Sequence, residues 1–358
     1  MHTEEFSLEG VKNELYQRHH PSLTNIDIEA HAETVYNILK LKKKHNVLML
    51  GHNYMEPLVF GLSETSEQGD SLGLSMHAAK TEAQYIIFNG VPFMAETAKI
   101  LNPLKTVLVA DKSAGCSLAD NFGAEDVKKL KALYPGVPVM IYINSYADAK
   151  AESDICCTSA NAAKIAQAMP GEEILFVPDI FFSQNLEQEL MGEKTVLYPG
   201  KGNQEPGAVC EVHERFSLQD LLAIRDSFEI PKGHPERILY AHWECRPEVL
   251  HEADYYGSTS QIRRDIAKRV EENTLERAFI ASECELTSNL AQEFPTIQFW
   301  TACSVRCSHM AKVSLDKVLR ILETLDSGGD LSPHEVTLSP EVIEGARSPI
   351  ERMLEMSD

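Results

Sequence analysis

The sequence predicts an α/β fold built from three homologous three-layer α/β/α domains in a pseudo-threefold arrangement. Strand-like runs alternate with helical patterns along the chain, which is typical of parallel sheets covered by helices. Cysteines also recur at nearly equal intervals, each at a similar distance after a strand-like run: Cys116, Cys210 and Cys307. One unit used three times explains both observations, and a pseudo-threefold arrangement brings the three thiols together at one point.

The first domain is expected at 32–134. It opens with the strand-like run VLML at 47–50, and a polar cluster at 69–71 precedes the helical pattern LGLSMHAAK. The run AQYIIFNG, the helical FMAETAKIL and the run TVLVA follow before the cysteine. Gly123 suits the N-cap of the helical pattern AEDVKKLKALY that closes the unit. Each domain is therefore expected to hold three strands, a cysteine loop and a closing helix.

The second and third domains, expected at 135–234 and 235–327, repeat this order. The second contains VMIYIN, ANAAKIAQAM, EILFVPD and TVLYPG, and the third contains ILYAHWE, QIRRDIAKRV, AFIAS and TIQFW. Ser217 and Ser314 suit the N-caps of their closing helices. Clusters of Pro and Gly between the units mark the boundaries.

Two terminal segments stand outside the triplication. Residues 1–31 are expected to form a helical extension, and 328–358 a tail that packs on the body of the protein. Ser339 followed by Pro340 suits the N-cap and first position of an amphipathic helix in that tail.

Charge and composition exclude several classes of function. The net charge of −21 at pH 7 repels nucleic-acid backbones, so no nucleic-acid partner is expected. No apolar run approaches the roughly 20 residues that a membrane span needs. The N-terminal stretch has acidic Glu4 and Glu5 and no apolar core, so we expect a cytoplasmic protein without a secretory signal. Eight cysteines in such a chain favour metal or redox chemistry over a disulfide framework.

Polar residues recur at equivalent places in the three units. In parallel α/β units, ligands bind beyond the carboxyl ends of the strands. Serines also stand where helices begin, and helix N-termini offer N–H groups and a dipole that favour anions. We therefore expect one central cavity lined by both sets: His52, Asn53, Tyr54, Tyr142, Asn144, His242 and Glu244 at strand ends, with Ser71, Ser159, Ser258 and Thr259 at helix starts.

At these residues the chain resembles the quinolinate synthase (NadA) family of NAD biosynthesis. The matching stretches include GHNY, GDSL, GVPFMAETAKILNPLKTVL, AGCSLAD, YINSYADAKAESD, FVPD, CEVH, EVLHEADYYGSTS and CSHMAKVSL. The resemblance implies three similar α/β domains around a central [4Fe–4S] cluster. It also implies that Cys116, Cys210 and Cys307 hold the cluster, which leaves one iron open as a Lewis acid.

The resemblance further implies a reaction. Iminoaspartate condenses with dihydroxyacetone phosphate, and phosphate and two waters leave to give quinolinate. Donors to the carboxylates of iminoaspartate are expected from His52, Tyr142, Asn144 and Ser159, and donors to the triose phosphate from Ser71, Ser258 and Thr259. The expected catalytic residues are Glu244 and Tyr54 for proton transfer, with His213 and His242 orienting or polarising. L-aspartate oxidase or aspartate dehydrogenase is the expected source of iminoaspartate.

Several simpler interpretations stay open for these residues. Buried cysteines are commonly inert, which is the expectation for Cys156, Cys157, Cys245 and Cys284. Cys303, close to Cys307, is a spare ligand, a redox partner or neither. The serines at helix starts suit ordinary N-caps, and His52 and His242 suit hydrogen-bonded histidines at strand ends.

Two departures from the family pattern stand near the expected site. Trp243 replaces the family's usual proline and adds a large ring beside two expected site residues. The loop before Cys210 is also longer than usual.

Two rival functions remain. One is another [4Fe–4S]-dependent dehydratase or lyase that acts on a related carboxylate. The presence of Trp243 in place of the family's proline, beside two expected site residues, is the reason to consider it. The other is an iron–sulfur sensor protein, although the acidic charge and the lack of a basic stripe count against a sensor of nucleic acids. A structural zinc site is less favoured, since the sequence has no Cys-x₂-Cys pair.

Overall fold

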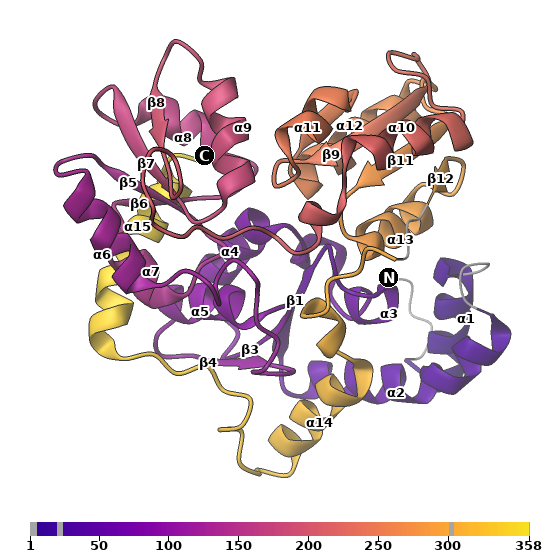
Figure 1. The fold of residues 1–358 in the computed structure, drawn as a ribbon. Helices are drawn as coiled ribbons and strands as arrows, with labels where there is room; N and C mark the ends of the chain where they lie inside the picture. The colour runs from indigo at the N-terminus through magenta and orange to yellow at the C-terminus, as the bar shows by residue number, and fades with distance from the viewer. Residues whose placement is uncertain (1–5, 20–23, 301–303, 358) are drawn as a thin grey trace.

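The computed structural model describes residues 6–19, 24–300 and 304–357. They form three α/β lobes, each with one four-stranded parallel sheet (Figure 1). This confirms the predicted fold class. Within the described residues, no helix combines the length and apolar character needed to cross a membrane.

The first sheet has the order β2-β1-β3-β4. Its buried central strand β1 (Val47–His52) pairs with β3 (Tyr85–Asn89). The edges are β2 (Gln68–Gly69) and β4 (Thr106–Val109). Its helices are α3 (Pro57–Phe60), α4 (Ser71–Lys80) and α5 (Pro92–Leu101), with a 3₁₀ turn at Thr65–Glu67.

The second and third sheets repeat this order as β6-β5-β7-β8 and β10-β9-β11-β12. The second lobe has strands β5 (Val139–Tyr142), β6 (Ile155–Cys157), β7 (Glu173–Val177) and β8 (Thr195–Leu197), with helices α7 (Ala147–Ala151), α8 (Ala162–Ala168) and α9 (Ile180–Glu189). The third has β9 (Arg237–His242), β10 (Tyr255–Gly257), β11 (Arg277–Ala281) and β12 (Gln298–Trp300), with α11 (Pro247–Glu252), α12 (Thr259–Glu271) and α13 (Cys284–Glu293).

The expectation of three strands per domain was wrong. Each sheet has a fourth, short edge strand, β2, β6 or β10, before the helix that follows it. The strands β2 and β10 read Gln-Gly and Tyr-Tyr-Gly, so they lack an apolar run, and β6 reads Ile-Cys-Cys, which is apolar but only three residues long. The strands β1, β5 and β9 also extend through His52, Tyr142 and His242, which are the last strand residues rather than the first loop residues.

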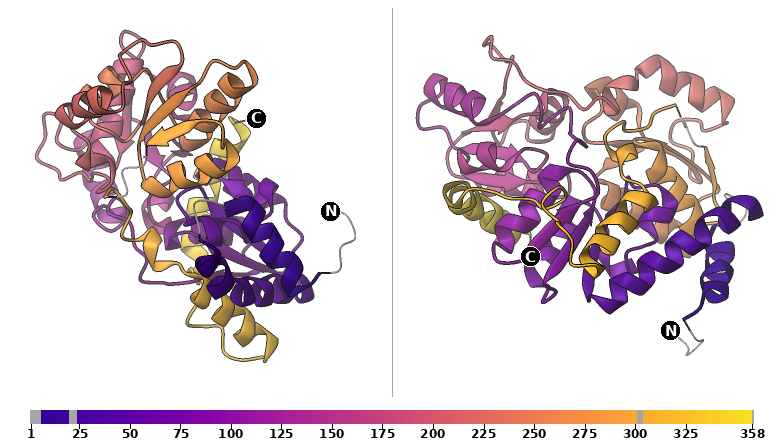
Figure 2. Two further views of the ribbon diagram at one scale, coloured as in Figure 1. Left: turned by 90° about the vertical axis from the view of Figure 1, so that its right-hand side faces the viewer. Right: turned by 90° about the horizontal axis from the view of Figure 1, so that it is seen from below.

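The helix after each cysteine loop packs against the next lobe. After Cys116, α6 (Ala124–Leu133) buries Val127 and Leu130 in the core of the second sheet. After Cys210, α10 (Leu218–Ser227) ties Arg225 to Glu252 of the third lobe. After Cys307, α14 (Leu315–Asp326) packs on α2 (Asn25–Lys44) of the first lobe (Figure 2). The three cysteine loops are therefore the crossings between lobes.

The terminal segments form helices, as their sequences predicted. Helix α1 (Leu8–His19) packs on α2, which continues without a break into the first lobe. Helix α15 (Pro340–Glu355) begins after the N-cap Ser339, whose hydroxyl accepts a hydrogen bond of 3.3 Å from the N–H of Val342. It packs on α7 and β6 of the second lobe.

Candidate active site

A cavity lies between the three lobes at the carboxyl ends of their central strands. It has about 700 Å³ of space between protein atoms, its open mouth included. The structure brings twelve of the predicted site residues to its walls and leaves out Asn53, His213 and Ser258. The lining ones are His52, Tyr54, Ser71, Cys116, Tyr142, Asn144, Ser159, Cys210, His242, Glu244, Thr259 and Cys307.

The three thiols occupy equivalent backbone positions. In each loop the carbonyl of the cysteine accepts a hydrogen bond from the residue four positions on, over 2.8 Å at Cys116, 3.0 Å at Cys210 and 3.1 Å at Cys307. Each sulfur also accepts backbone N–H groups from the residues two or three positions on. The repeat predicted from sequence therefore extends to the local hydrogen bonding of the sulfur atoms.

Burial holds these thiols in the protonated form when nothing positive is near them. It raises the pKa of Cys116 to about 12 and that of Cys307 to about 11, and it raises the pKa of Cys210 well above the ordinary value. The backbone N–H groups oppose this rise by favouring the thiolate. The charges of Cys116 and Cys307 both add to the effect on Cys210, because the three sulfurs share one cavity.

Side chains next to the cysteines fasten the three loops to one another. The hydroxyl of Ser117 donates to the carbonyl of Val209 and accepts from the N–H of Glu211, both over 3.0 Å. The carboxylate of Glu211 in turn accepts from the hydroxyl of Ser308 over 2.8 Å. Lys312, beyond the third cysteine, donates to the carbonyl of Ser113 over 2.6 Å. We call this closed set of contacts the loop clasp.

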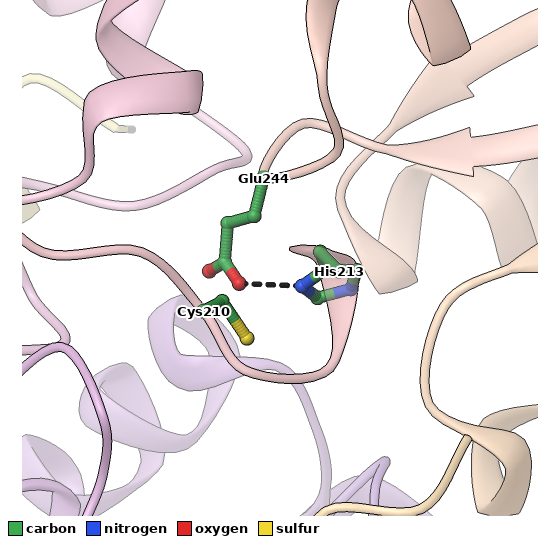
Figure 3. Close-up of side chains that lie close together, drawn as sticks. All are labelled: Cys210, His213 and Glu244. Atoms are coloured by element: carbon green, nitrogen blue, oxygen red, sulfur yellow. Dashed lines mark ion pairs between the residues drawn. The ribbon is translucent and has the colours of Figure 1, made fainter. Parts of the chain in front are cut away.

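Glu244 is the buried hub of the polar wall. One of its oxygens accepts from the Tyr142 hydroxyl over 2.5 Å and from the Asn144 amide over 3.2 Å. Its other oxygen lies 2.7 Å from Nδ1 of His213 (Figure 3). Despite this short distance, Nδ1 makes no hydrogen bond with any described residue, so its geometry towards the carboxylate is not that of a hydrogen bond.

The neighbours of Glu244 keep it ionised. Burial alone raises its pKa, but the charge of His213 and its contact with the carboxylate, followed by His242 and Tyr142, lower the pKa to about 2. Burial, followed by the charge of Glu244, raises the pKa of both Tyr54 and Tyr142 well above the ordinary value. The cavity therefore presents one carboxylate beside two phenols that stay protonated.

His52 and His242 have matching hydrogen bonds that fix their tautomers. Nδ1 of His52 accepts from the N–H of Tyr54 over 3.2 Å, and Nδ1 of His242 accepts from the N–H of Glu244 over 3.4 Å. Burial lowers the pKa of His52 to about 4; burial, followed by the charge of His213, lowers that of His242 to about 3. Both rings are therefore neutral at pH 7 and carry their proton on Nε2.

His213 does not line the cavity. Its ring stacks on His242, with centroids 4.6 Å apart, and its Nε2 lies 3.1 Å from the hydroxyl of Ser282. The Tyr54 hydroxyl also contacts Ser282, over 2.8 Å. His213 is thus placed behind Glu244, where it orients the carboxylate. The ligand atoms of Cys210, His213 and Glu244 lie within 4.8 Å of one another, so these three residues could together hold a metal ion.

The serines at helix starts differ from one another. Ser258 is a buried N-cap whose hydroxyl accepts from the N–H of Gln261 over 3.1 Å, so the simpler interpretation holds for it. Ser71 is the first residue of α4 rather than its cap, which is Asp70. Ser159 hydrogen-bonds Tyr142, and Thr259 accepts from the Asn53 amide over 2.7 Å.

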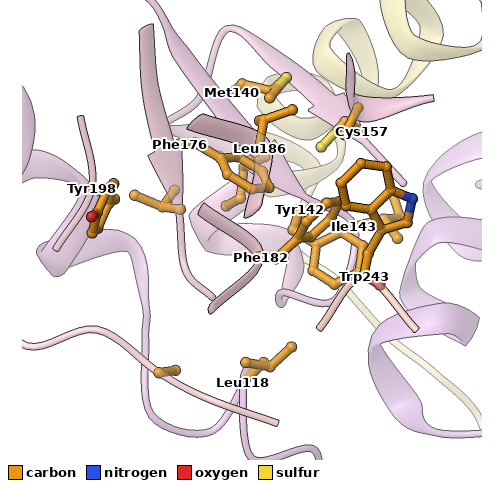
Figure 4. Close-up of a cluster of buried hydrophobic side chains, with 14 of the residues drawn as sticks. Leu118, Met140, Tyr142, Ile143, Cys157, Phe176, Phe182, Leu186, Tyr198 and Trp243 are labelled. Atoms are coloured by element: carbon orange, nitrogen blue, oxygen red, sulfur yellow. The ribbon is translucent and has the colours of Figure 1, made fainter. Parts of the chain in front are cut away.

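Trp243 points away from the cavity. Its ring packs in the core of the second lobe against Phe182, with centroids 5.7 Å apart (Figure 4). It also packs against Tyr256, with centroids 4.9 Å apart. The large ring therefore does not narrow the site between His242 and Glu244, so the rival function loses its rationale. Four other cysteines, Cys156, Cys157, Cys245 and Cys284, are buried as expected, and Cys303 lies outside the described residues.

Sequence reasoning missed several residues of this site. Asp70, Thr158 and Glu211 line the cavity, and each is adjacent to a residue that was predicted. Glu283, the N-cap of α13, was also missed: its carboxylate accepts from the N–H of Cys307 over 3.2 Å. Burial, opposed by that hydrogen bond, raises the pKa of Glu283 to about 7. Adjacency was a signal for the first three residues, but nothing in the sequence links Glu283 to the third cysteine.

Comparisons with known proteins agree with this geometry. The family described as "Quinolinate synthetase A protein" matches residues 36–355. Quinolinate synthase 2 of Mesorhizobium japonicum is 39% identical over 95% of this chain and 96% of its own length. The quinolinate synthases of Agrobacterium fabrum and Xylella fastidiosa are both 38% identical, over 98% and 92% of this chain and 96% and 86% of their own lengths. A match of this extent, to a chain that carries three equivalent thiols in one cavity, shows that the protein belongs to the quinolinate synthetase A family.

Proposed function

We propose that this protein is an enzyme that condenses iminoaspartate with dihydroxyacetone phosphate to form quinolinate, and that it does so with a [4Fe–4S] cluster. The names of its relatives support the product. The observation that carries the proposal is the convergence of three equivalent thiols with the Glu244 network in one cavity. Iminoaspartate is the product of an oxidation of aspartate, so L-aspartate oxidase or aspartate dehydrogenase is the proposed supplier.

The thiol set fits such a cluster. Cys116, Cys210 and Cys307 offer three soft sulfur donors, and their burial disfavours free thiolates unless a positive centre binds them. Backbone N–H groups that point at each sulfur are of the kind that stabilise cluster thiolates. When bound, the cluster supplies a Lewis acid at the one iron that lacks a protein ligand, which polarises a substrate oxygen and eases the loss of water.

The neutral histidines and the phenols suit the binding of anionic substrates. His52 and His242 carry Nε2–H, and Tyr54 stays protonated, so each offers a donor to a carboxylate or carbonyl oxygen. Ser71 at the start of α4 and Thr259 at the start of α12 lie where helix dipoles favour a phosphate. Neutral donors orient these groups without the cost of burying a further charge.

Proton transfer falls to Glu244 and Tyr54. Glu244 is held as a carboxylate and accepts a proton from a substrate carbon or nitrogen, while Tyr54 donates to a leaving oxygen. Burial and the neighbours of Glu244 act on its pKa in opposite directions. A substrate that draws His213 away leaves burial dominant and makes Glu244 a stronger base.

An anaerobic assay tests this proposal. Reconstituted protein, supplied with freshly generated iminoaspartate and dihydroxyacetone phosphate, is expected to form quinolinate with release of inorganic phosphate. The Cys116→Ser variant is expected to lose both the brown colour and the product, whereas the matched Cys156→Ser variant, altered at a buried core cysteine, keeps both. A fully loaded wild-type protein that forms no quinolinate would favour the rival dehydratase or lyase. A brown Cys116→Ser variant with wild-type iron content would remove that residue from the ligand set.

A further inference from the structure

A second cavity lies between the first and third lobes. It has about 920 Å³ of space between protein atoms, its mouth included. The first lobe contributes Arg18 of α1, the 3₁₀ turn at Thr65 and the edge strand β2. The third lobe contributes Ser260 and Arg263 of α12, together with residues of α13. None of the residues in the active-site cavity lines it.

Neighbouring residues of the same two backbone segments line the two cavities. Gly69 lines the second cavity, and Asp70, the next residue, lines the active site; Thr259 and Ser260 are divided in the same way. Two side-chain hydrogen bonds cross between the lobes here: the amide of Asn53, on the second-cavity side, donates to the hydroxyl of Thr259 over 2.7 Å, and the hydroxyl of Ser258 donates to the carboxylate of Asp70 over 3.5 Å. The wall between the two cavities is therefore closed here by one short and one long hydrogen bond between two lobes.

The second cavity has a positive charge that the surrounding protein lacks. Arg18 forms no ion pair with any described residue, so its charge is uncompensated there. Arg263 pairs with Glu293, with Nε 2.6 Å from a carboxylate oxygen, and both belong to the lining. Glu293 is the sole acidic residue among the described lining residues, which leaves a net positive charge in a chain of net charge −21.

We propose that this second cavity is an antechamber that captures the anionic substrates, a dicarboxylate and a phosphate monoester, and passes them to the active site between Asn53 and Thr259. This inference rests on the proposed function, which requires both substrates to be anions. A positive mouth in an acidic protein concentrates anions where diffusion alone would be opposed by the overall field. Passage requires the Asn53–Thr259 and Ser258–Asp70 hydrogen bonds to open, and the polar groups of Asn53 and Thr259 can then contact the passing anion.

A plug tests whether substrates pass through the antechamber. Thr65 is exposed and lines it, while Ser66, its exposed neighbour, does not. The Thr65→Trp variant is expected to lower kcat/KM for both substrates at least severalfold, with kcat little changed, and the matched Ser66→Trp variant to behave as wild type. Equal kcat/KM in the two variants, at equal thermal stability and iron content, would overturn the antechamber.

Charge removal provides an independent measurement. The Arg18→Gln variant is expected to lower kcat/KM by about 3- to 10-fold at low ionic strength, and the difference from wild type is expected to shrink as salt screens the charge. Arg320→Gln is the control, since it removes the same charge from an exposed position on α14 outside both cavities. A loss that does not depend on salt, or that is equal in both variants, would refute capture by Arg18. Absence of quinolinate with the wild-type protein would instead refute the proposed function.

Discussion

Replacement of Glu244 by glutamine isolates the charge of the hub residue from its shape. The amide oxygen of glutamine can still accept the hydrogen bonds from Tyr142 and Asn144, which now span 2.5 and 3.2 Å. The amide nitrogen of the glutamine then faces Nδ1 of His213. Nδ1 accepts a hydrogen bond from this amide when the imidazole carries its proton on Nε2. The cavity is therefore expected to keep its shape while it loses its carboxylate.

The magnitude follows from what the charge does. A positioned acid or base contributes roughly 10²- to 10⁴-fold to the rate, so kcat is expected to fall by about that factor. This corresponds to about 3 to 5 kcal/mol of transition-state stabilisation. KM is expected to change much less, because the direct donors to the substrates are the histidines and phenols. The iron content is also expected to stay at the wild-type level, since Glu244 is not among the three proposed ligands.

Single-turnover quench experiments under argon, with quinolinate measured by chromatography, separate this chemical effect from product release. Tyr142→Phe is the matched control, because it removes a hydrogen bond to the carboxylate but keeps the charge. The Tyr142→Phe variant is expected to lose about 1.5 to 3 kcal/mol of transition-state stabilisation, which is less than the loss expected for Glu244→Gln. A Glu244→Gln variant with the wild-type single-turnover rate would refute the acid–base role, and one without iron would make Glu244 a ligand.

Three further predictions concern the surroundings of the site. Glu211→Ala opens the loop clasp at Ser308 and is expected to shorten the half-life of the bound iron under a chelator severalfold; an unchanged half-life would show that the clasp does not hold the loops. His52 and His242 have folded-state pKa values of about 4 and about 3, so the unfolded chain binds more protons below its ordinary histidine pKa near 6.5. The stability that they contribute is complete above pH 6.5 and is lost as the pH falls towards 4. In denaturant titrations at different pH values, the unfolding free energy of a His52→Gln variant should fall less steeply with decreasing pH than that of the wild type, by up to about 1.4 kcal/mol per pH unit. Equal slopes of unfolding free energy against pH in the two proteins would contradict this. Trp243→Ala is expected to destabilise the fold by about 3 to 5 kcal/mol with little effect on KM, because its ring packs in the core; a large change in KM at wild-type stability would place the ring in the site.

The sequence alone identified the parts of the site that follow from strand register. Residues at the carboxyl ends of parallel strands meet at one edge of a sheet, so His52, Tyr142, His242 and Glu244 were found from their positions. The three cysteines were found for a related reason, because a repeated fold places equivalent residues equivalently. Both inferences use spacing along the chain, which the sequence contains directly.

Contacts between distant segments were beyond this reasoning. The Ser117–Val209 hydrogen bond joins residues 92 positions apart, and the Asn53–Thr259 bond joins residues 206 apart. Spacing also does not say which way a side chain points. Trp243 stands between two cavity residues in the sequence yet packs in the core, and Ser258 caps its helix instead of reaching the cavity. The short edge strands were missed because two or three residues are too few to show a periodic pattern, even where they are apolar, as in β6.

Iron and acid-labile sulfide counts on anaerobically purified protein test the central claim most directly. We expect four irons and four sulfides per chain, lost together when any one of Cys116, Cys210 and Cys307 is replaced by serine. Full occupancy by a single zinc, or a complete cluster that survives in one of those variants, would contradict it.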